Sequence, residues 1–90
     1  MTKAYRVMVG GRVQGVGFRY HVQTRAFAHG IFGWVRNTPD GKVEAHLEGD
    51  EEKVRQFIAW MWEGPPMAQV DSIAEIEAAP KRFTSFEVRH

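Results

Sequence analysis

The stretch Gly11-Arg12-Val13-Gln14-Gly15-Val16-Gly17-Phe18-Arg19 lies between a strand-like run, Tyr5 to Val9, and a helix-like run. Gly15 and Gly17 can adopt positive φ angles, which turn successive backbone N–H groups into one anion-binding concavity. A helix that begins just after the loop directs its positive end at the same hollow. Arg19 stands at that junction, and its guanidinium can hold a phosphate through two parallel hydrogen bonds. The stretch therefore predicts a phosphate cradle with its own cation.

Glycine spacing alone leaves a plainer interpretation open, in which the loop is only a turn and Arg19 only a solvated charge. The residues around the glycines exclude two known phosphate-binding motifs. No Gly-Lys-Ser/Thr follows the glycines, so the loop is not the nucleotide P-loop. The dinucleotide fingerprint G-x-G-x-x-G, with its acidic residue about 20 positions further on, is also absent.

The longer pattern is more specific than the glycines. The string GRVQGVGFR at 11–19 is followed by GWVRN at 33–37 and PDG at 39–41. This pattern closely resembles the acylphosphatase family, small enzymes that hydrolyse the carboxyl–phosphate bond of acyl phosphates. The resemblance extends from the first strand to Phe86-Glu87-Val88-Arg89. It implies the family's fold, a small-molecule acyl phosphate as substrate, no cofactor, no metal, no phosphoenzyme and a monomer.

The composition sets the limits of the chain. Its 90 residues are enough for one small domain with a two-layer fold, and we expect residues 1–90 to form a single, free-standing domain. Twelve Lys and Arg residues against 11 Asp and Glu give a net charge of +1, which favours neither nucleic acid nor an anionic membrane. Cysteine is absent, and we see neither a signal-peptide core nor a membrane span. We therefore expect a soluble cytoplasmic protein.

Hydrophobic periodicity predicts the first half of the fold. Tyr5, Val7 and Val9 alternate with Arg6 and Met8, as in a strand that faces two environments. Phe18, Val22 and Ala26 recur at four-residue spacing, which predicts a helix from about Tyr20 to His29 that Gly30 caps. Ile31 to Asn37 is expected to be a strand, and Thr38-Pro39-Asp40-Gly41 a tight turn.

The second half continues the pattern. Val43, Ala45 and Leu47 alternate with Glu44, His46 and Glu48, which predicts a strand buried on one face only. Asp50 is placed as the N-cap of a second helix, whose apolar positions are Val54, Phe57, Ile58 and Met61. Strands are expected over Val70 to Ala78 and Phe83 to Arg89. The order predicts an α+β fold of the ferredoxin-like, split β-α-β type: an antiparallel sheet of four to five strands with both helices on one face.

Function has to be argued from sites, because this fold supports many activities. Asn37 ends the second predicted strand, and its side-chain carbonyl can accept a hydrogen bond from a water molecule that would attack the phosphate. The alternative is that Asn37 merely starts the turn. By resemblance, Arg19 and Asn37 fall on the family's catalytic positions, and the phosphate-binding residues are Gln14, Gly15, Val16, Gly17, Phe18 and Arg19. Phosphate or sulfate is expected to inhibit by filling the cradle.

The remaining candidates receive plainer interpretations. His21, His29, His46 and His90 show no metal-ligand spacing and are expected on the surface or on helices. His29 replaces the apolar residue that the resemblance leads us to expect before Gly30. The tryptophans are expected in the core or on helix flanks (Trp34, Trp60 and Trp62). Thr38 is a candidate for holding the turn or the water.

Two other functions remain as alternatives. An RNA-binding module of similar fold would place aromatic residues on its central strands, but Lys42 to Glu48 contains none, and the RNP1 pattern is absent. A carrier-type or non-catalytic phosphate-binding module is the second alternative, as in the acylphosphatase-like domain of hydrogenase-maturation carbamoyltransferases.

Overall fold

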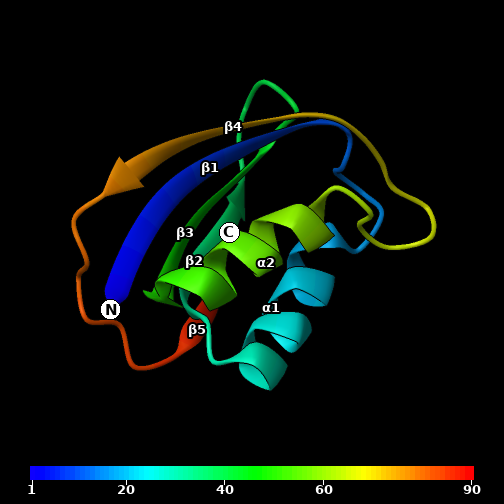
Figure 1. The fold of residues 1–90 in the computed structure, drawn as a ribbon. Coiled ribbons are helices and arrows are strands. Elements are labelled where there is room, and N and C mark those ends of the chain that lie inside the picture. The colour runs from blue at the N-terminus through cyan, green and yellow to red at the C-terminus, as the bar shows by residue number, and fades with distance from the viewer.

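The computed structural model describes all 90 residues and contains two helices and five strands (Figure 1). In chain order they are β1 (Thr2–Arg12), α1 (Phe18–His29), β2 (Phe32–Asn37), β3 (Val43–Asp50), α2 (Glu51–Met61), β4 (Gln69–Ala78) and β5 (Phe86–Arg89). The predicted order of elements is confirmed. The last strand is shorter than expected, because residues 83–85 belong to the connection that leads into β5.

The strands form one sheet in the order β4-β1-β3-β2-β5, which contains the ferredoxin-like arrangement of β4, β1, β3 and β2. Both helices cover one face of this sheet (Figure 1). The first four strands pair antiparallel, whereas β5 pairs parallel to β2. The sheet is therefore mixed rather than wholly antiparallel. The fifth strand pairs with β2 at the edge opposite β4, and residues 79–85 connect these two edges.

The hydrophobic core fills the space between the sheet and the helices. The predicted apolar positions of both helices are buried: Phe18, Val22 and Ala26 in α1, and Val54, Phe57, Ile58 and Met61 in α2. Strands β1 and β3 contribute their alternating apolar side chains to the same cluster. Burial of these side chains, at about 25 cal/mol per Å² of apolar surface, holds the two helices against the sheet.

The outer face of β3 departs from the sequence prediction. All six residues from Val43 to Glu48 are buried, including the polar ones. Glu44 lies beneath Arg6 and Arg36, with the Arg36 Nη2 atom 2.6 Å from its carboxylate. The prediction of a half-exposed strand was wrong here because side chains of neighbouring strands and the connection between β4 and β5 cover the polar face.

His46 is the clearest case of this burial, since we expected it on the surface and it is 0% exposed. Its ring stacks on Trp34 and meets the edge of Phe83. Its Nε2 atom lies 2.8 Å from Glu48, whose carboxylate also accepts the backbone N–H groups of Lys81 and Arg82. The connection between β4 and β5 is thereby fastened to the outer face of the sheet.

Two further predictions concern helix ends and tryptophans. Asp50 occupies the N-cap position of α2, but its side chain makes no capping bond and instead pairs with the amino group of Met1. Gly30 caps α1 in the left-handed conformation, as predicted. Trp34 is buried, Trp60 packs partly buried against the core, and Trp62 follows the end of α2 with 48% of its surface exposed.

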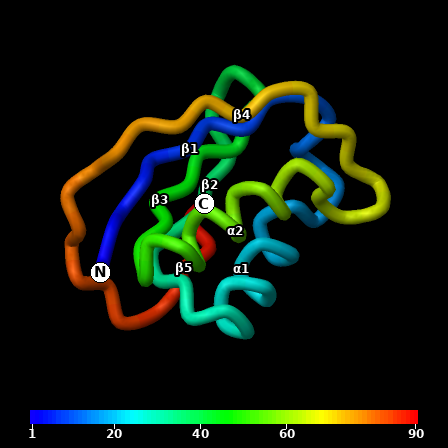
Figure 2. The backbone as a smooth tube through the Cα atoms, in the orientation of Figure 1, coloured from blue at the N-terminus to red at the C-terminus, as the bar shows by residue number.

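Figure 2 shows β1 running into the loop that precedes α1, at the end of the sheet where the turn between β2 and β3 also lies. Hydrogen bonds from Gln14 to Thr38 and Lys42 join these two segments. The fold therefore brings the glycine-rich loop beside the turn that follows Asn37.

Candidate functional site

The glycine-rich loop adopts the conformation that its glycines permit. Gly15 and Gly17 have φ angles of 74° and 76°, both in the left-handed region, where other residues are strained. Gly17 is the N-cap of α1, and the first helical hydrogen bond runs from the N–H of His21 to its carbonyl. The N–H groups of the first turn have no partner within the helix, and no acidic side chain lies there. The loop thus leaves an uncompensated positive helix end beside its own N–H groups.

Arg19 is the predicted cation of this site, and its side chain contacts the C-terminal segment of the chain. Its Nη1 atom donates to the backbone carbonyl of Arg89 over 2.8 Å and lies 3.2 Å from Nδ1 of His90, which accepts because arginine can only donate. The side chain is half-buried. Nη1 of Arg19 is therefore anchored by Arg89 and His90, which are 70 and 71 positions away in the sequence. The other guanidinium donors have no partner in the protein.

Gln14 and Phe18 belong to the predicted cradle but use their side chains elsewhere. The amide nitrogen of Gln14 donates to the carbonyls of Thr38 and Lys42, at 2.8 and 2.9 Å, so both of its hydrogens are engaged. Phe18 is buried in the core, and Val16 packs against the same cluster from a partly buried position. These three residues can meet a phosphate only through backbone N–H groups.

The turn after β2 is organised by Thr38. Its hydroxyl accepts from the N–H of Lys42 at 3.0 Å and donates to the carboxylate of Asp40. The hydrogen bond from Thr38 lowers the pKa of the Asp40 carboxyl. Thr38 therefore holds the turn, which is one of the two roles considered for it from the sequence.

Asn37 is the last residue of β2, opposite Val43 in β3. Its side chain is half-buried and takes part in none of the side-chain hydrogen bonds of the turn. The alternative role, in which Asn37 starts the turn by bonding to its own backbone, is filled by Thr38 instead. Asn37 thus leaves its donor and acceptor available at the turn that Gln14 ties to the loop.

None of the four cavities of the molecule is lined by residues 14–19 or by Asn37. The predicted site is an open surface rather than an enclosed pocket. No group of three or more His, Asp or Glu side chains is arranged to hold a metal ion. No helix has the length and apolar character that crossing a membrane requires.

Sequence reasoning missed the anchoring contacts of the site. The bonds from Gln14 to the turn span 24 and 28 residues, and those from Arg19 to the C-terminal segment span 70 and 71. No local pattern encodes such pairs, because they depend on which strands become neighbours. The predicted order of elements implies the split β-α-β fold, but it does not specify which side chain joins the loop to the turn after β2.

Comparison with known proteins gives a consistent result. The sequence model of the acylphosphatase family matches residues 5–88. A curated acylphosphatase of Nocardioides sp. is 45% identical over 89 residues, which cover 99% of this chain and 90% of the relative. The crystal structure of the Bacillus subtilis acylphosphatase superposes with a TM-score of 0.94 at 38% identity, covering all of both chains. Full-length HypF, in a phosphate- and nucleotide-bound form, has a TM-score of 0.89 at 27% identity, and this chain covers 12% of its length.

Proposed function

This chain belongs to the acylphosphatase family and acts as an acylphosphatase, and from that premise we propose how its own residues carry out the hydrolysis. Arg19 and the backbone N–H groups of residues 15–19 bind the phosphoryl oxygens of the substrate, and Asn37 orients the attacking water. The observation that carries this proposal is the bond from Gln14 to the carbonyl of Thr38, because it holds the loop beside the residue after Asn37. We propose that residues 1–90 form one acylphosphatase-like domain.

The phosphoryl group is bound by fixed donors. The left-handed glycines Gly15 and Gly17 orient successive N–H groups toward one side, as in other backbone anion sites. The anchored guanidinium of Arg19 keeps its remaining donors available for two phosphoryl oxygens. These groups are in place before the substrate binds, so they stabilise developing charge without reorganisation.

The proposed hydrolysis needs few catalytic groups beyond these donors and Asn37. Water attacks phosphorus, the bond from phosphorus to the carboxyl oxygen breaks, and a carboxylate leaves with the bonding electrons while inorganic phosphate retains the new oxygen. A carboxylate whose conjugate acid has a pKa of about 4 departs without a general acid. A loose transition state leaves positioning and charge stabilisation as the main tasks, and a phosphate oxygen can take the proton of the water. The mechanism therefore uses no metal and no covalent intermediate.

The finer properties of the protein are part of the same proposal. Orthophosphate and sulfate are competitive inhibitors because they match the cradle in charge and shape. We also propose that the protein works as a monomer, as the resemblance to the family implies, and that it is cytoplasmic. The alternatives of a carrier module or an RNA-binding module are not favoured, because the relatives matched over nearly the whole chain are acylphosphatases.

The test is hydrolysis of benzoyl phosphate by the purified protein in the presence of a metal chelator, followed with and without added orthophosphate. We expect turnover that the chelator leaves unchanged and that phosphate inhibits by raising KM alone. Loss of activity in chelator that added divalent metal restores would overturn the metal-free mechanism. Phosphate binding without any turnover would identify a carrier module instead.

A further inference from the structure

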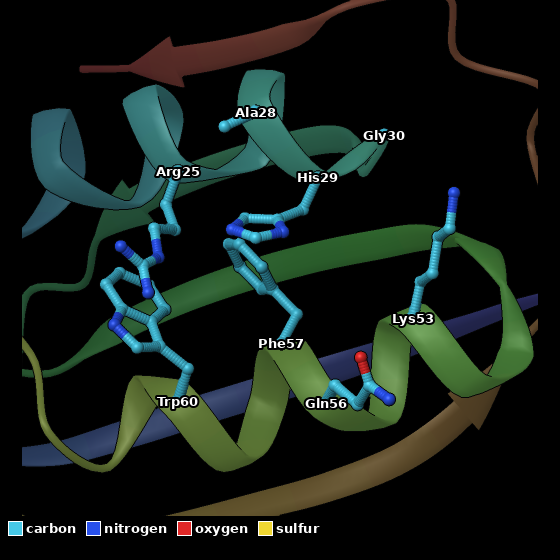
Figure 3. Close-up of a pocket in the computed structure, with 8 residues that line it drawn as sticks. All are labelled: Arg25, Ala28, His29, Gly30, Lys53, Gln56, Phe57 and Trp60. Atoms are coloured by element: carbon cyan, nitrogen blue, oxygen red, sulfur yellow. The ribbon is translucent and has the colours of Figure 1, made fainter.

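A pocket of about 390 Å³ lies between the two helices, away from the predicted catalytic residues. Its lining comes from the second half of α1 and from one face of α2, and comprises Arg25, Ala28, His29, Gly30, Lys53, Gln56, Phe57 and Trp60. Figure 3 shows Arg25 and His29 extending from α1 toward α2, and Lys53 extending from α2 toward the Gly30 end of α1. The volume falls within the range of about 300–1,000 Å³ that small-molecule sites occupy. We name this feature the interhelical pocket.

The interhelical pocket concentrates basic groups that have no acidic partner. Arg25, His29 and Lys53 line it, and no Asp or Glu does. Neither Arg25 nor Lys53 takes part in any ion pair, whereas Lys3 and Arg55, for example, each pair with a carboxylate. In a chain with a net charge of only +1, such a cluster is a local excess rather than a general property of the surface.

The helix dipole does not account for all of these charges. His29 lies in the last turn of α1, where the negative helix end favours a basic group, and Arg25 lies one turn earlier. Lys53 lies in the first turn of α2, where the positive helix end disfavours a cation. The three groups nevertheless converge on one pocket, so an anion between the helices is the common partner that would stabilise them all.

Aromatic rings shape the same pocket. The guanidinium carbon of Arg25 lies 4.7 Å from the ring centroid of Trp60, and the ring of Phe57 packs against the same indole at 5.3 Å. Stacking fixes the plane of the guanidinium and leaves its N–H edges available for an oxyanion. Phe57 is buried in the core and supplies an apolar floor.

We propose that the interhelical pocket is a second anion site, distinct from the catalytic cradle, and that its ligand is a chain of linked phosphates. The spacing of the cations supports more than one phosphate. Lys53 and Trp60, on which Arg25 stacks, are seven residues apart in α2, or about 10 Å along the helix axis. With its two ends this far apart, the pocket is expected to match a triphosphate better than a single orthophosphate. The ligand is either an inorganic polyphosphate or the phosphate chain of a nucleotide.

The test is calorimetric titration of sodium triphosphate, in magnesium-free buffer of low ionic strength, into the Arg19→Ala variant, whose catalytic cradle is disabled. Adding Arg25→Gln and Lys53→Gln to that variant is expected to weaken binding at least about tenfold, because two charge-assisted hydrogen bonds are lost. The matched control adds Lys3→Gln and Arg55→Gln, which remove the same charge from outside the pocket, and is expected to bind within about twofold of the Arg19→Ala protein.

A second measurement uses the wild-type protein, so that no substitution can disturb its fold. Triphosphate added to the isotope-labelled wild-type protein with the cradle filled by orthophosphate is expected to shift the NMR signals of Arg25, Lys53 and the Trp60 indole. Tighter binding of ATP than of triphosphate would identify a nucleotide, and equal binding an inorganic polyphosphate. Equal affinity in the pocket and control variants, shifts confined to residues 15–19, or orthophosphate binding as tight as triphosphate would each overturn the proposal. The Arg25→Gln and Lys53→Gln changes are expected to leave benzoyl phosphate turnover intact, which makes this test independent of the catalytic proposal.

Discussion

The side-chain amide of Gln14 lies 2.8 Å from the backbone carbonyl of Thr38 and 2.9 Å from that of Lys42. One side chain in the loop thus holds both sides of the turn that follows Asn37. In the proposed mechanism, water is aimed at a phosphorus atom held by the loop, so we expect the relative position of these two segments to affect the rate. We therefore propose that the Gln14 side chain positions the loop against the turn, in addition to the predicted place of Gln14 in the phosphate-binding segment.

Replacing Gln14 by Ala is expected to lower kcat about tenfold or more while the phosphate inhibition constant changes little, because small displacements of reacting groups are costly. The free energy of unfolding is expected to fall by about 1 kcal/mol for each hydrogen bond lost. Steady-state kinetics and urea denaturation measure these two effects. Gln23→Ala is the control, since Gln23 also bonds a backbone carbonyl, that of Phe86, outside the site. A Gln14→Ala variant with wild-type kcat would show that Gln14 has no positioning role.

Gly17 and Gly30 stand at the two ends of α1 in the same left-handed conformation, and both have open space where a Cβ atom would lie. Each change to Ala is expected to cost about 1–2 kcal/mol of stability through backbone strain alone. Only Gly17→Ala is expected also to weaken phosphate binding, because it reorients the N–H groups of the cradle. Thermal unfolding and phosphate titration of the two variants separate these effects. Equal loss of phosphate affinity in both would show that global strain, not the cradle, is responsible.

Arg19→Ala is expected to raise KM and to lower kcat, with a combined loss in kcat/KM of about 10²–10³-fold, because the phosphoryl group loses its fixed charge in the ground and transition states alike. Arg19→Lys keeps the charge but loses the planar pair of donors, so it is expected to restore only part of the activity. Arg25→Gln, on the same helix, is the control and should behave as the wild type. Kinetics with benzoyl phosphate distinguish these variants, and an active Arg19→Ala protein contradicts the assignment.

Glu48 makes stability depend on pH. Burial alone would raise the pKa of its carboxyl, but hydrogen bonds from the backbone N–H groups of Lys81 and Arg82 and from His46 outweigh burial, and the pKa is lowered in the folded protein. Because the pKa of Glu48 is lower in the folded protein than its unfolded value of about 4.3, the carboxylate stabilises the fold at pH values above the unfolded pKa. This stabilisation is lost as the pH falls through the folded pKa.

Glu48→Gln is therefore expected to lower the free energy of unfolding at pH 7 by about 1–3 kcal/mol, through the loss of charge-assisted hydrogen bonds. The difference from the wild type is expected to shrink as the pH falls below about 4. Urea denaturation at several pH values measures it. A constant difference across that range would show that the Glu48 charge is not the cause.

The sequence predicted the fold well because its signals are local. Four-residue spacing fixed the buried faces of both helices, and Gly30 and the turn sequence marked where elements end. It failed on β3, where alternation of Glu44, His46 and Glu48 suggested an exposed face. Their burial depends on Arg6, Arg36 and the segment from Lys81 to Phe83, which come from other parts of the chain.

Some features of the candidate site could likewise be predicted from local sequence, and others could not. The loop conformation and the place of Arg19 at the start of α1 follow from neighbouring residues, so they were predictable. The anchoring of Arg19 by Arg89 and the crossing bond of Gln14 depend on tertiary contacts between distant segments. Likewise, no pattern in the sequence brings Arg25 and Lys53 together, because they lie on separate helices that only the fold makes neighbours.

The most direct test of the central claim is the kinetics of Asn37→Ala with benzoyl phosphate in chelator, together with its inhibition by orthophosphate. We predict that kcat falls about 10²-fold or more, because the water is no longer oriented, while the phosphate inhibition constant stays within about twofold, because the cradle is untouched. A variant that retains wild-type kcat, or one that loses phosphate affinity and turnover together, would contradict the separate roles assigned to Arg19 and Asn37.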